Sequence, residues 1–72
     1  MLKTTYIYSF LELSGKPKRF LESKSDCKIL GYGVSADTVT LSVLYEDTKA
    51  FNNLNKELYD NFKLVPTNIN FI

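Results

Sequence analysis

The first part of the chain alternates apolar and polar residues with a period of two. Tyr6, Tyr8 and Phe10 recur at every second position of KTTYIYSFLEL (3–13), a segment rich in β-branched and aromatic residues. This composition and this spacing are typical of a β-strand with one face against a core. We therefore predict that the chain begins with a strand over 3–13.

A turn and a second strand are expected next. SGKPK (14–18) carries Gly15 and Pro17 and is the strongest turn signal of the chain, since proline cannot donate a hydrogen bond to a sheet. RFLES (19–23) follows and is interpreted as a short second strand.

Two further strands, 27–35 and 38–46, are predicted to form a β-hairpin around Ala36-Asp37. A loop of two or four residues centred there pairs residues whose numbers add up to 73. On one face this register pairs apolar residues with one another: Leu30 with Val43, Tyr32 with Leu41, and Val34 with Val39. On the other face it pairs Gly31 with Ser42 and Gly33 with Thr40.

Gly31-Tyr32-Gly33, followed by Ala36, has the spacing of a dinucleotide-binding turn. In such a turn a helix starts at the second or third glycine, so that its N–H groups meet the phosphates. Here the residues after Ala36 alternate as a strand in TVTLSVLY (38–45). The motif therefore predicts a hairpin and no nucleotide site, and no cofactor is expected.

After Asp47 the spacing of apolar residues changes to that of a helix. Four of them fall on one stripe of an amphipathic helix: Phe51, Leu54, Leu58 and Phe62. Asp47 or Thr48 is a suitable N-cap. The helix is expected to end near Asn61, and the residue before Pro66 is expected to be extended.

The segments 62–65 and 68–72 are each candidates for a short terminal strand. The expected order is β-β-β-β-α, with one more strand as an option at the end. The predicted fold class is α+β: a small antiparallel β-sheet of about four strands with one C-terminal amphipathic helix packed on one face, in a single domain over 1–72. The helix is expected to cover the face that carries Leu30, Tyr32, Val34, Leu41 and Val43.

The composition fits a small packed domain. Of the 72 residues, 44% are hydrophobic, and five Phe and five Tyr are present. A domain of this size needs good packing or a partner, because core burial only just exceeds chain entropy. With one cysteine, Cys27, and no histidine, neither a disulfide nor a structural zinc site is predicted.

The expected location is the cytoplasm. No stretch approaches the roughly 20 apolar residues of a membrane span, and the N-terminus lacks the pattern of a signal peptide. A single cysteine without an export signal favours a reducing compartment.

Groups suited to catalysis are scarce. Without histidine, no side chain has an ordinary pKa near neutrality that suits a general base. The carboxylate pairs Glu46-Asp47 and Glu57/Asp60 lack the ligand spacing of a calcium or magnesium loop. Cys27 is interpreted as a buried, inert strand cysteine, since a nucleophile needs a lowered pKa. We predict no enzyme activity and no catalytic or metal site.

Five of the nine basic residues fall within thirteen positions: Lys16, Lys18, Arg19, Lys24 and Lys28. With Phe20 and the tyrosines of the first strand nearby, such a group is able to hold phosphates and stack bases. The net charge of +1 provides no general attraction to polyanions. A lysine-bearing turn that protects a sheet edge from aggregation is the favoured interpretation. Nucleic-acid binding through Lys16, Lys18, Arg19 and Lys24 is the alternative.

The chain contains more large aromatic residues than one small core can easily bury. Tyrosine is frequent at interfaces, because its ring is apolar while its hydroxyl stays hydrated. An exposed aromatic stripe on the first strand, or a free sheet edge, suits pairing with a partner. The predicted partner contact comprises Tyr6, Tyr8, Phe10, Lys16, Lys18 and Arg19. The alternative is that several of the aromatic rings form the core of the domain.

The segment FLESKSDCKILGYGVSADTVTLSVLYED (20–47) resembles small accessory proteins encoded by tailed phages and prophages. In those, a tyrosine-rich first strand precedes a short strand, a KIL strand and a V-x-L-x-V-L hairpin partner. The Asn-rich helix and KLVPTNINFI depart from that pattern, and no functional residue is carried over. The resemblance implies a phage or mobile-element accessory protein, a class that includes stoichiometric inhibitors of host machinery and host defence systems.

The leading hypothesis is therefore a non-enzymatic cytoplasmic interaction module that occupies a surface of a larger protein. One alternative is the nucleic-acid-binding β domain described above. The other is a structural subunit that assembles into a homo-oligomer through its own sheet edges.

Overall fold

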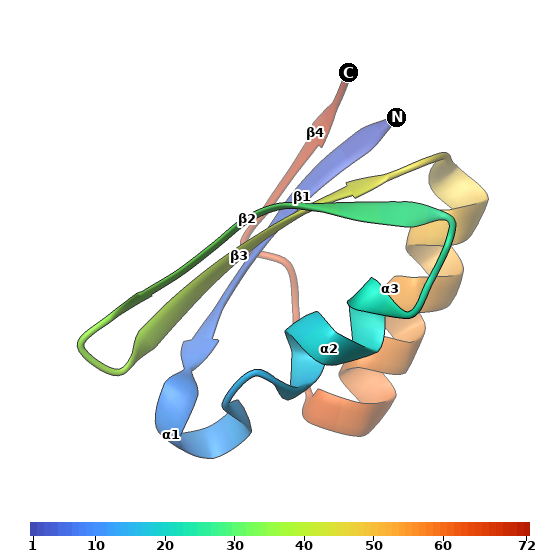
Figure 1. The fold of residues 1–72 in the computed structure, drawn as a ribbon. Helices are drawn as coiled ribbons and strands as arrows, with labels where there is room; N and C mark the ends of the chain where they lie inside the picture. The colour runs from blue at the N-terminus through green and yellow to red at the C-terminus, as the bar shows by residue number, and fades with distance from the viewer.

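The computed structural model describes all residues 1–72 and contains one antiparallel sheet with the strand order β2-β3-β1-β4 (Figure 1). The strands are β1 (Leu2–Ser9), β2 (Cys27–Ser35), β3 (Thr38–Tyr45) and β4 (Asn68–Phe71). The helices are α1 (Phe10–Leu13), α2 (Lys16–Glu22) and α3 (Thr48–Phe62). Both α2 and α3 lie on one side of the sheet, and no helix covers the other side (Figure 1). The predicted α+β class, with a C-terminal helix on a four-stranded sheet, is confirmed.

Strand β1 lies at the centre of the sheet, between β3 and β4. Its predicted alternation is confirmed, since Tyr6 and Tyr8 are buried while Ile7 between them is exposed. The strand ends at Ser9, earlier than predicted, where Ser9 pairs with Thr38 as the last residue pair with β3. Residues beyond Ser9 have no neighbouring strand, and 10–13 form the single turn α1 instead.

The predicted second strand at 19–23 is wrong, because residues 19–22 belong to α2 and Ser23 is the C-cap of this helix. Pro17 stands in the first turn of α2, where its missing N–H removes no helical hydrogen bond. Lys18 and Glu22 then form an i,i+4 salt bridge of 2.8 Å along the helix. The predicted turn is confined to Ser14-Gly15, where Ser14 has a φ of 52°. The observed order is β-α-α-β-β-α-β.

The β2–β3 hairpin is confirmed, and its register agrees with the prediction near the turn. Four predicted pairs are present: Gly31 with Ser42, Tyr32 with Leu41, Gly33 with Thr40, and Val34 with Val39. Ala36 has a φ of 56°, the left-handed conformation that two-residue hairpin turns favour. The predicted pair of Leu30 with Val43 is wrong. A β-bulge shifts the register between Ile29 and Gly31, so that Ile29 pairs with Val43 and Leu30 is 46% exposed.

Helix α3 begins as predicted, with Asp47 as its N-cap. The Ala50 N–H donates to Asp47 Oδ1 at 2.8 Å. The predicted stripe faces the core, with Leu54 and Leu58 buried and Phe51 and Phe62 packed against them. The helix ends at Phe62, because Lys63 adopts a left-handed conformation with a φ of 60°. Of the two candidate terminal strands, 62–65 is not a strand, and 68–71 forms β4.

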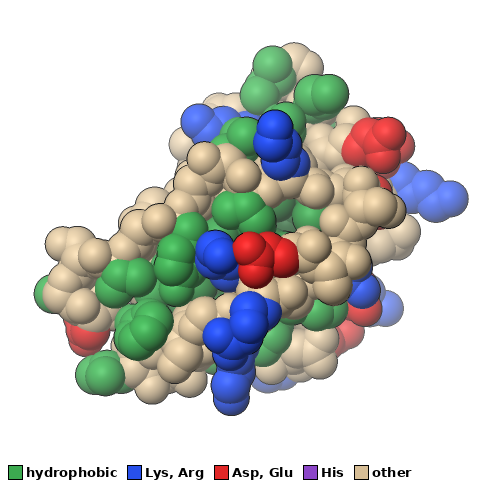
Figure 2. Space-filling view, in the orientation of Figure 1, with side chains coloured by type: hydrophobic (Ala, Val, Ile, Leu, Met, Phe, Trp, Pro, Cys, Tyr) green, Lys and Arg blue, Asp and Glu red, His purple; other side chains and the backbone are tan.

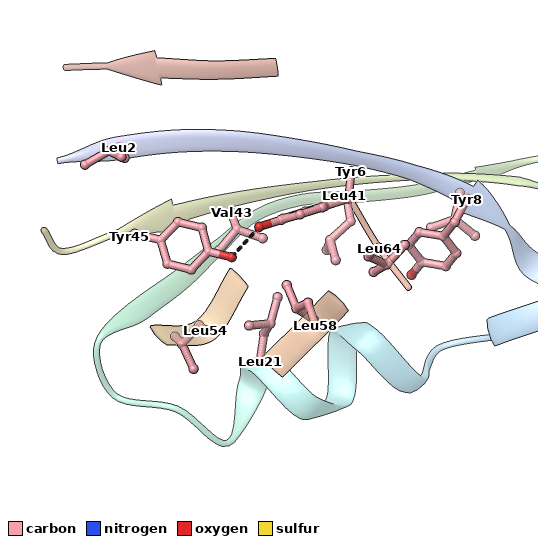
Figure 3. Packing of buried hydrophobic residues seen from close by; sticks show 11 residues of the cluster. Leu2, Tyr6, Tyr8, Leu21, Leu41, Val43, Tyr45, Leu54, Leu58 and Leu64 are labelled. Atoms are coloured by element: carbon pink, nitrogen blue, oxygen red, sulfur yellow. Dashed lines mark hydrogen bonds between the residues drawn. The ribbon is translucent and has the colours of Figure 1, made fainter. Parts of the chain in front are cut away.

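The core lies between the sheet and the helices (Figure 3). Its buried hydrophobic residues are Leu2, Tyr6, Tyr8, Leu21, Val39, Leu41, Val43, Tyr45, Leu54, Leu58 and Leu64. Helix α3 covers β1 and β3, where Asn55 contacts Tyr6 and Phe51 packs edge-on against Tyr45 at 5.4 Å between ring centroids. Strand β2 is covered by α2 instead. The predicted position of α3 is therefore correct for Leu41 and Val43 but not for the residues of β2. No helix has the length and apolar character that crossing a membrane requires.

Candidate interaction surface

Two residues of the predicted partner contact, Tyr6 and Tyr8, are core residues. Their rings extend from β1 toward the helical layer (Figure 3). Tyr6 is fully buried, and Tyr8 is 9% exposed. A partner cannot reach these rings in the folded chain, so this part of the predicted contact is corrected. The alternation identified the residues that share a face, but α2 and α3 determine which face is covered.

The hydroxyl of Tyr6 belongs to a buried hydrogen-bond chain. It donates to Asn55 Oδ1 at 2.9 Å and therefore accepts a hydrogen bond from the Tyr45 hydroxyl, which lies 2.7 Å away. Burial raises the pKa of Tyr6 to about 12, and burial together with Tyr6 raises the pKa of Tyr45. Both phenols are neutral at physiological pH. The chain of hydrogen bonds joins β1, β3 and α3 and has a structural role.

The hydroxyl of Tyr8 is buried without a hydrogen-bond partner. Burial, and secondarily the nearby Tyr32, raises the pKa of Tyr8 to about 12. A phenol with so high a pKa does not act as a base near neutral pH. Tyr8 therefore contributes its ring to the core.

The remaining predicted contact residues lie at one corner of the molecule. Phe10 is 38% exposed in α1, and Lys16 and Arg19 are exposed in α2. The Phe10 N–H donates to the Asp37 carbonyl at 2.6 Å, which fastens α1 to the hairpin loop. Figure 2 shows hydrophobic side chains over the hairpin and α1, beside the Lys and Arg side chains of α2. The structure thus places one aromatic and two basic residues of the prediction, all exposed, on two consecutive helices.

Two residues that the sequence reasoning did not select extend this corner. Leu11 is 81% exposed in α1, and Val34 is exposed near the end of β2. The sequence did contain an indication that Leu11 is exposed, because Leu11 is out of phase with the alternating residues Tyr6, Tyr8 and Phe10. We refer to Phe10, Leu11, Lys16, Arg19 and Val34 as the corner surface.

The three basic residues of α2 differ in what they contact. Lys18 forms the only salt bridge of the structure, with Glu22, and its Nζ lies 5.3 Å from the ring centroid of Tyr32. Its charge is therefore already partnered within the chain. Lys16 and Arg19 have no carboxylate partner. Gly15 leaves room for the Arg19 guanidinium, since a Cβ at Gly15 would lie 3.2 Å from Arg19 Nη1.

The five clustered basic residues do not form a single surface. Lys24 lies over the Phe20 ring, with its Nζ 4.8 Å from the centroid, on the helical side of the molecule. Lys28 alternates with the core-facing Cys27 and Ile29 and thus belongs to the open face of the sheet. The tyrosines of β1 are on the covered face. Phosphate contacts and base stacking are therefore not combined on one sheet edge, as the nucleic-acid alternative supposed.

A shallow pocket of about 210 Å³ lies at the opposite end of the sheet. It is lined by Met1, Ser25, Asp26, Cys27, Lys28, Leu44 and Glu46. The Cys27 thiol donates to the Leu21 carbonyl at 3.6 Å, and burial, followed by Asp26, raises the pKa of Cys27. A raised pKa keeps the thiol protonated and poorly nucleophilic. No three His, Cys, Asp or Glu side chains gather as metal ligands would.

Comparison with protein-family models, curated proteins and solved structures gives no match for this chain. The resemblance to phage accessory proteins accordingly stays a prediction. The function proposed below is based on the corner surface and its charges.

Proposed function

We propose that the chain is a non-enzymatic interaction module that binds a larger protein stoichiometrically through the corner surface. One observation carries the proposal: hydrophobic side chains over the hairpin and α1 lie beside the Lys and Arg side chains of α2 (Figure 2). The exposed residues of these two helices include Phe10 and Leu11 in α1 and Lys16 and Arg19 in α2. Apolar side chains bordered by charge are typical of protein-binding sites on small domains. Aromatic residues and arginine are also the types that carry most binding energy.

The charges of the corner surface indicate the chemistry of the partner. Lys16 and Arg19 have no carboxylate partner within the chain. A partner that places Asp or Glu side chains around an apolar pocket would pair with both and bury Leu11. We therefore expect an acidic rim around the binding pocket of the partner.

A phage or mobile-element accessory protein in the host cytoplasm is the biological setting that we propose. Such a protein would inhibit or modulate a host protein, for example one of a defence system, by occupying its surface. This mode of action requires only a folded surface and one copy of the module per target. The resemblance over 20–47 and the corner surface support it.

The test is affinity capture from bacterial lysate with a matched set of variants. The corner variant combines Leu11→Ser with Arg19→Glu. The control variant makes the same chemical changes on the open face, with Ile7→Ser and Lys3→Glu. Circular dichroism establishes that both variants are folded.

We expect one stoichiometric protein to bind the wild-type and control chains, to survive nuclease treatment and to be lost with the corner variant. Equal capture by the corner variant would contradict the proposal. Loss of the partner after nuclease treatment would favour nucleic-acid binding through Lys16, Lys18, Arg19 and Lys24 instead.

A further inference from the structure

Strand β4 leaves one row of backbone groups unpaired. It forms an outer strand of the sheet and pairs only with β1. Met1 and Ile72 exchange both backbone hydrogen bonds, at 2.9 and 3.5 Å. Such two-bond pairs alternate with pairs that lack hydrogen bonds along an antiparallel ladder. Asn70 therefore also faces β1, and Ile69 and Phe71 direct their N–H and C=O groups away from the sheet.

Two apolar side chains of β4 lie on the same face of the sheet as the helices, but no helix covers them. Ile69 pairs with Thr4 and Phe71 with Leu2, so both apolar side chains lie on the helical side of the sheet. Figure 3 shows β4 separated from the helices by β1 and β3. As a result Ile69 is 41% and Phe71 77% exposed.

The two outer strands of the sheet are protected to different degrees. Strand β2 carries Lys28 and the bulge at Leu30, and α2 packs against it. Charges and bulges at an outer strand prevent other strands from pairing with it. The β4 sequence Asn-Ile-Asn-Phe contains no charge, no proline and no bulge. Two copies of β4 can therefore approach one another without repulsion between like charges.

We propose that β4 pairs antiparallel with β4 of a second copy of this chain, about a two-fold axis at Asn70. In this register Ile69 of each copy lies opposite Phe71 of the other. All four unpaired backbone groups of each strand are then hydrogen-bonded, and the apolar side chains meet on the covered face. Registers shifted by two residues keep the apolar side chains on the covered face, but they leave the backbone groups of Ile69 or Phe71 without partners within β4. The self-complementary pattern of β4 thus selects a second copy as the occupant.

Pairing in this register produces a continuous eight-stranded sheet. The four-stranded order is extended through the two-fold axis, and both copies keep their helices on the same side. The two Asn70 side chains meet on the open face, where each amide both donates and accepts. The contact lies at the β4 edge, whereas the corner surface is made by α1, α2 and the hairpin.

The test measures the solution mass of the untagged chain by sedimentation equilibrium over a range of concentrations. A tag is avoided because Met1 pairs with Ile72 beside the contact. We expect the mass to rise with concentration from 8.3 kDa to twice that value. Asn70→Asp places two carboxylates opposite each other and should weaken the dimer about tenfold. The matched control, Asn53→Asp on the exposed side of α3, should dimerise like the wild type.

Charge complementation gives the most specific result. Asn70→Lys alone should weaken the dimer to a similar degree, whereas an equimolar mixture of Asn70→Asp and Asn70→Lys should restore the dimer, because opposite charges then meet at the axis. A wild-type mass of 8.3 kDa at every concentration, or an Asn70→Asp chain that dimerises like the wild type, would overturn the proposal. The corner variant should dimerise normally, so this result and that of the capture experiment are independent.

Discussion

The hydroxyl oxygens of Tyr6 and Tyr45 lie 2.7 Å apart beneath α3, and the Tyr6 hydroxyl donates a hydrogen bond to Asn55 Oδ1. Two residues further along β1, the hydroxyl of Tyr8 is buried with no partner at all. Two tyrosines on the same face of β1 thus differ: the hydroxyl of Tyr6 is hydrogen-bonded, and that of Tyr8 is not. The contrast separates the contribution of a phenol hydroxyl from that of its ring.

Removing the hydroxyl of Tyr6 should lower the stability of the fold, whereas removing that of Tyr8 should not. Tyr6→Phe leaves Tyr45 and Asn55 without their partner and should lower the free energy of unfolding by about 1–2 kcal/mol. Tyr8→Phe removes a hydroxyl that makes no hydrogen bond and should leave stability unchanged or raise it by up to about 1 kcal/mol. Urea unfolding of the two variants beside the wild type measures both values. Equal destabilisation by the two changes would contradict the hydrogen-bond assignment.

Stability should decline in alkaline solution. Burial raises the pKa of Tyr6 and Tyr8 to about 12 in the folded chain, against 10.0 for an ordinary tyrosine. The contribution of these two neutral phenols to the free energy of unfolding is complete below pH 10. It is lost as the pH rises from 10 toward 12, because in this range the two hydroxyls lose their protons in the unfolded chain but keep them in the folded one. For Tyr6 the loss approaches about 1.4 kcal/mol per pH unit.

Urea midpoints at pH 7, 9, 10 and 11 check this pH dependence. The Tyr6→Phe variant provides the control, since its stability should fall less steeply above pH 10. A wild-type midpoint that is constant up to pH 11 would show that Tyr6 and Tyr8 ionise equally in both states.

The β-bulge predicts unequal roles for two adjacent residues of β2. Ile29 pairs with Val43 and packs against the core, whereas Leu30 is the extra residue of the bulge and is exposed. Ile29→Ala should cost about 2 kcal/mol, and Leu30→Ala should change stability by less than about 0.5 kcal/mol. Thermal or urea unfolding distinguishes the two. The reverse order would restore the simple register in which Leu30 faces Val43.

The N-cap of α3 should make a measurable contribution. Asp47 accepts the Ala50 N–H at 2.8 Å, and Asp47→Ala should therefore lower the free energy of unfolding by about 1 kcal/mol. Asp60→Ala removes the same charge from the exposed side of α3 and should have little effect. If the two variants were equally stable, the hydrogen bond to Ala50 would contribute nothing net.

Much of the fold was predictable because local patterns determine it. The pairs Tyr32–Leu41 and Val34–Val39 follow from matching apolar residues across a tight turn, and the stripe through Leu54 and Leu58 follows from helical spacing. The bulge at Leu30 was not predictable, since either Ile29 or Leu30 satisfies an apolar pattern. The segment 19–23 was too short to distinguish a strand from a helix, and Pro17 suits both a turn and a helix start.

The candidate site was less predictable than the fold. Exposure of an aromatic residue depends on where the helices pack, and the sequence pattern of β1 is the same whichever face they cover. Tyr8 and Phe10 therefore looked equivalent, although the first is in the core and the second lies at the surface. The charges were clearer: Lys16 and Arg19 were selected from the sequence and are exposed without carboxylate partners.

The central position of β1 has a consequence for how the chain acquires its structure during synthesis. Strand β1 pairs with β3 and β4, which both follow it in the sequence and are therefore synthesised after it. Its buried face, including Tyr6, must stay unprotected until those residues are available. The β2–β3 hairpin, whose contacts are local, is therefore the element that can form first, and β1 joins it by closing a long loop. Folding of this chain should thus be completed only after translation has reached β4.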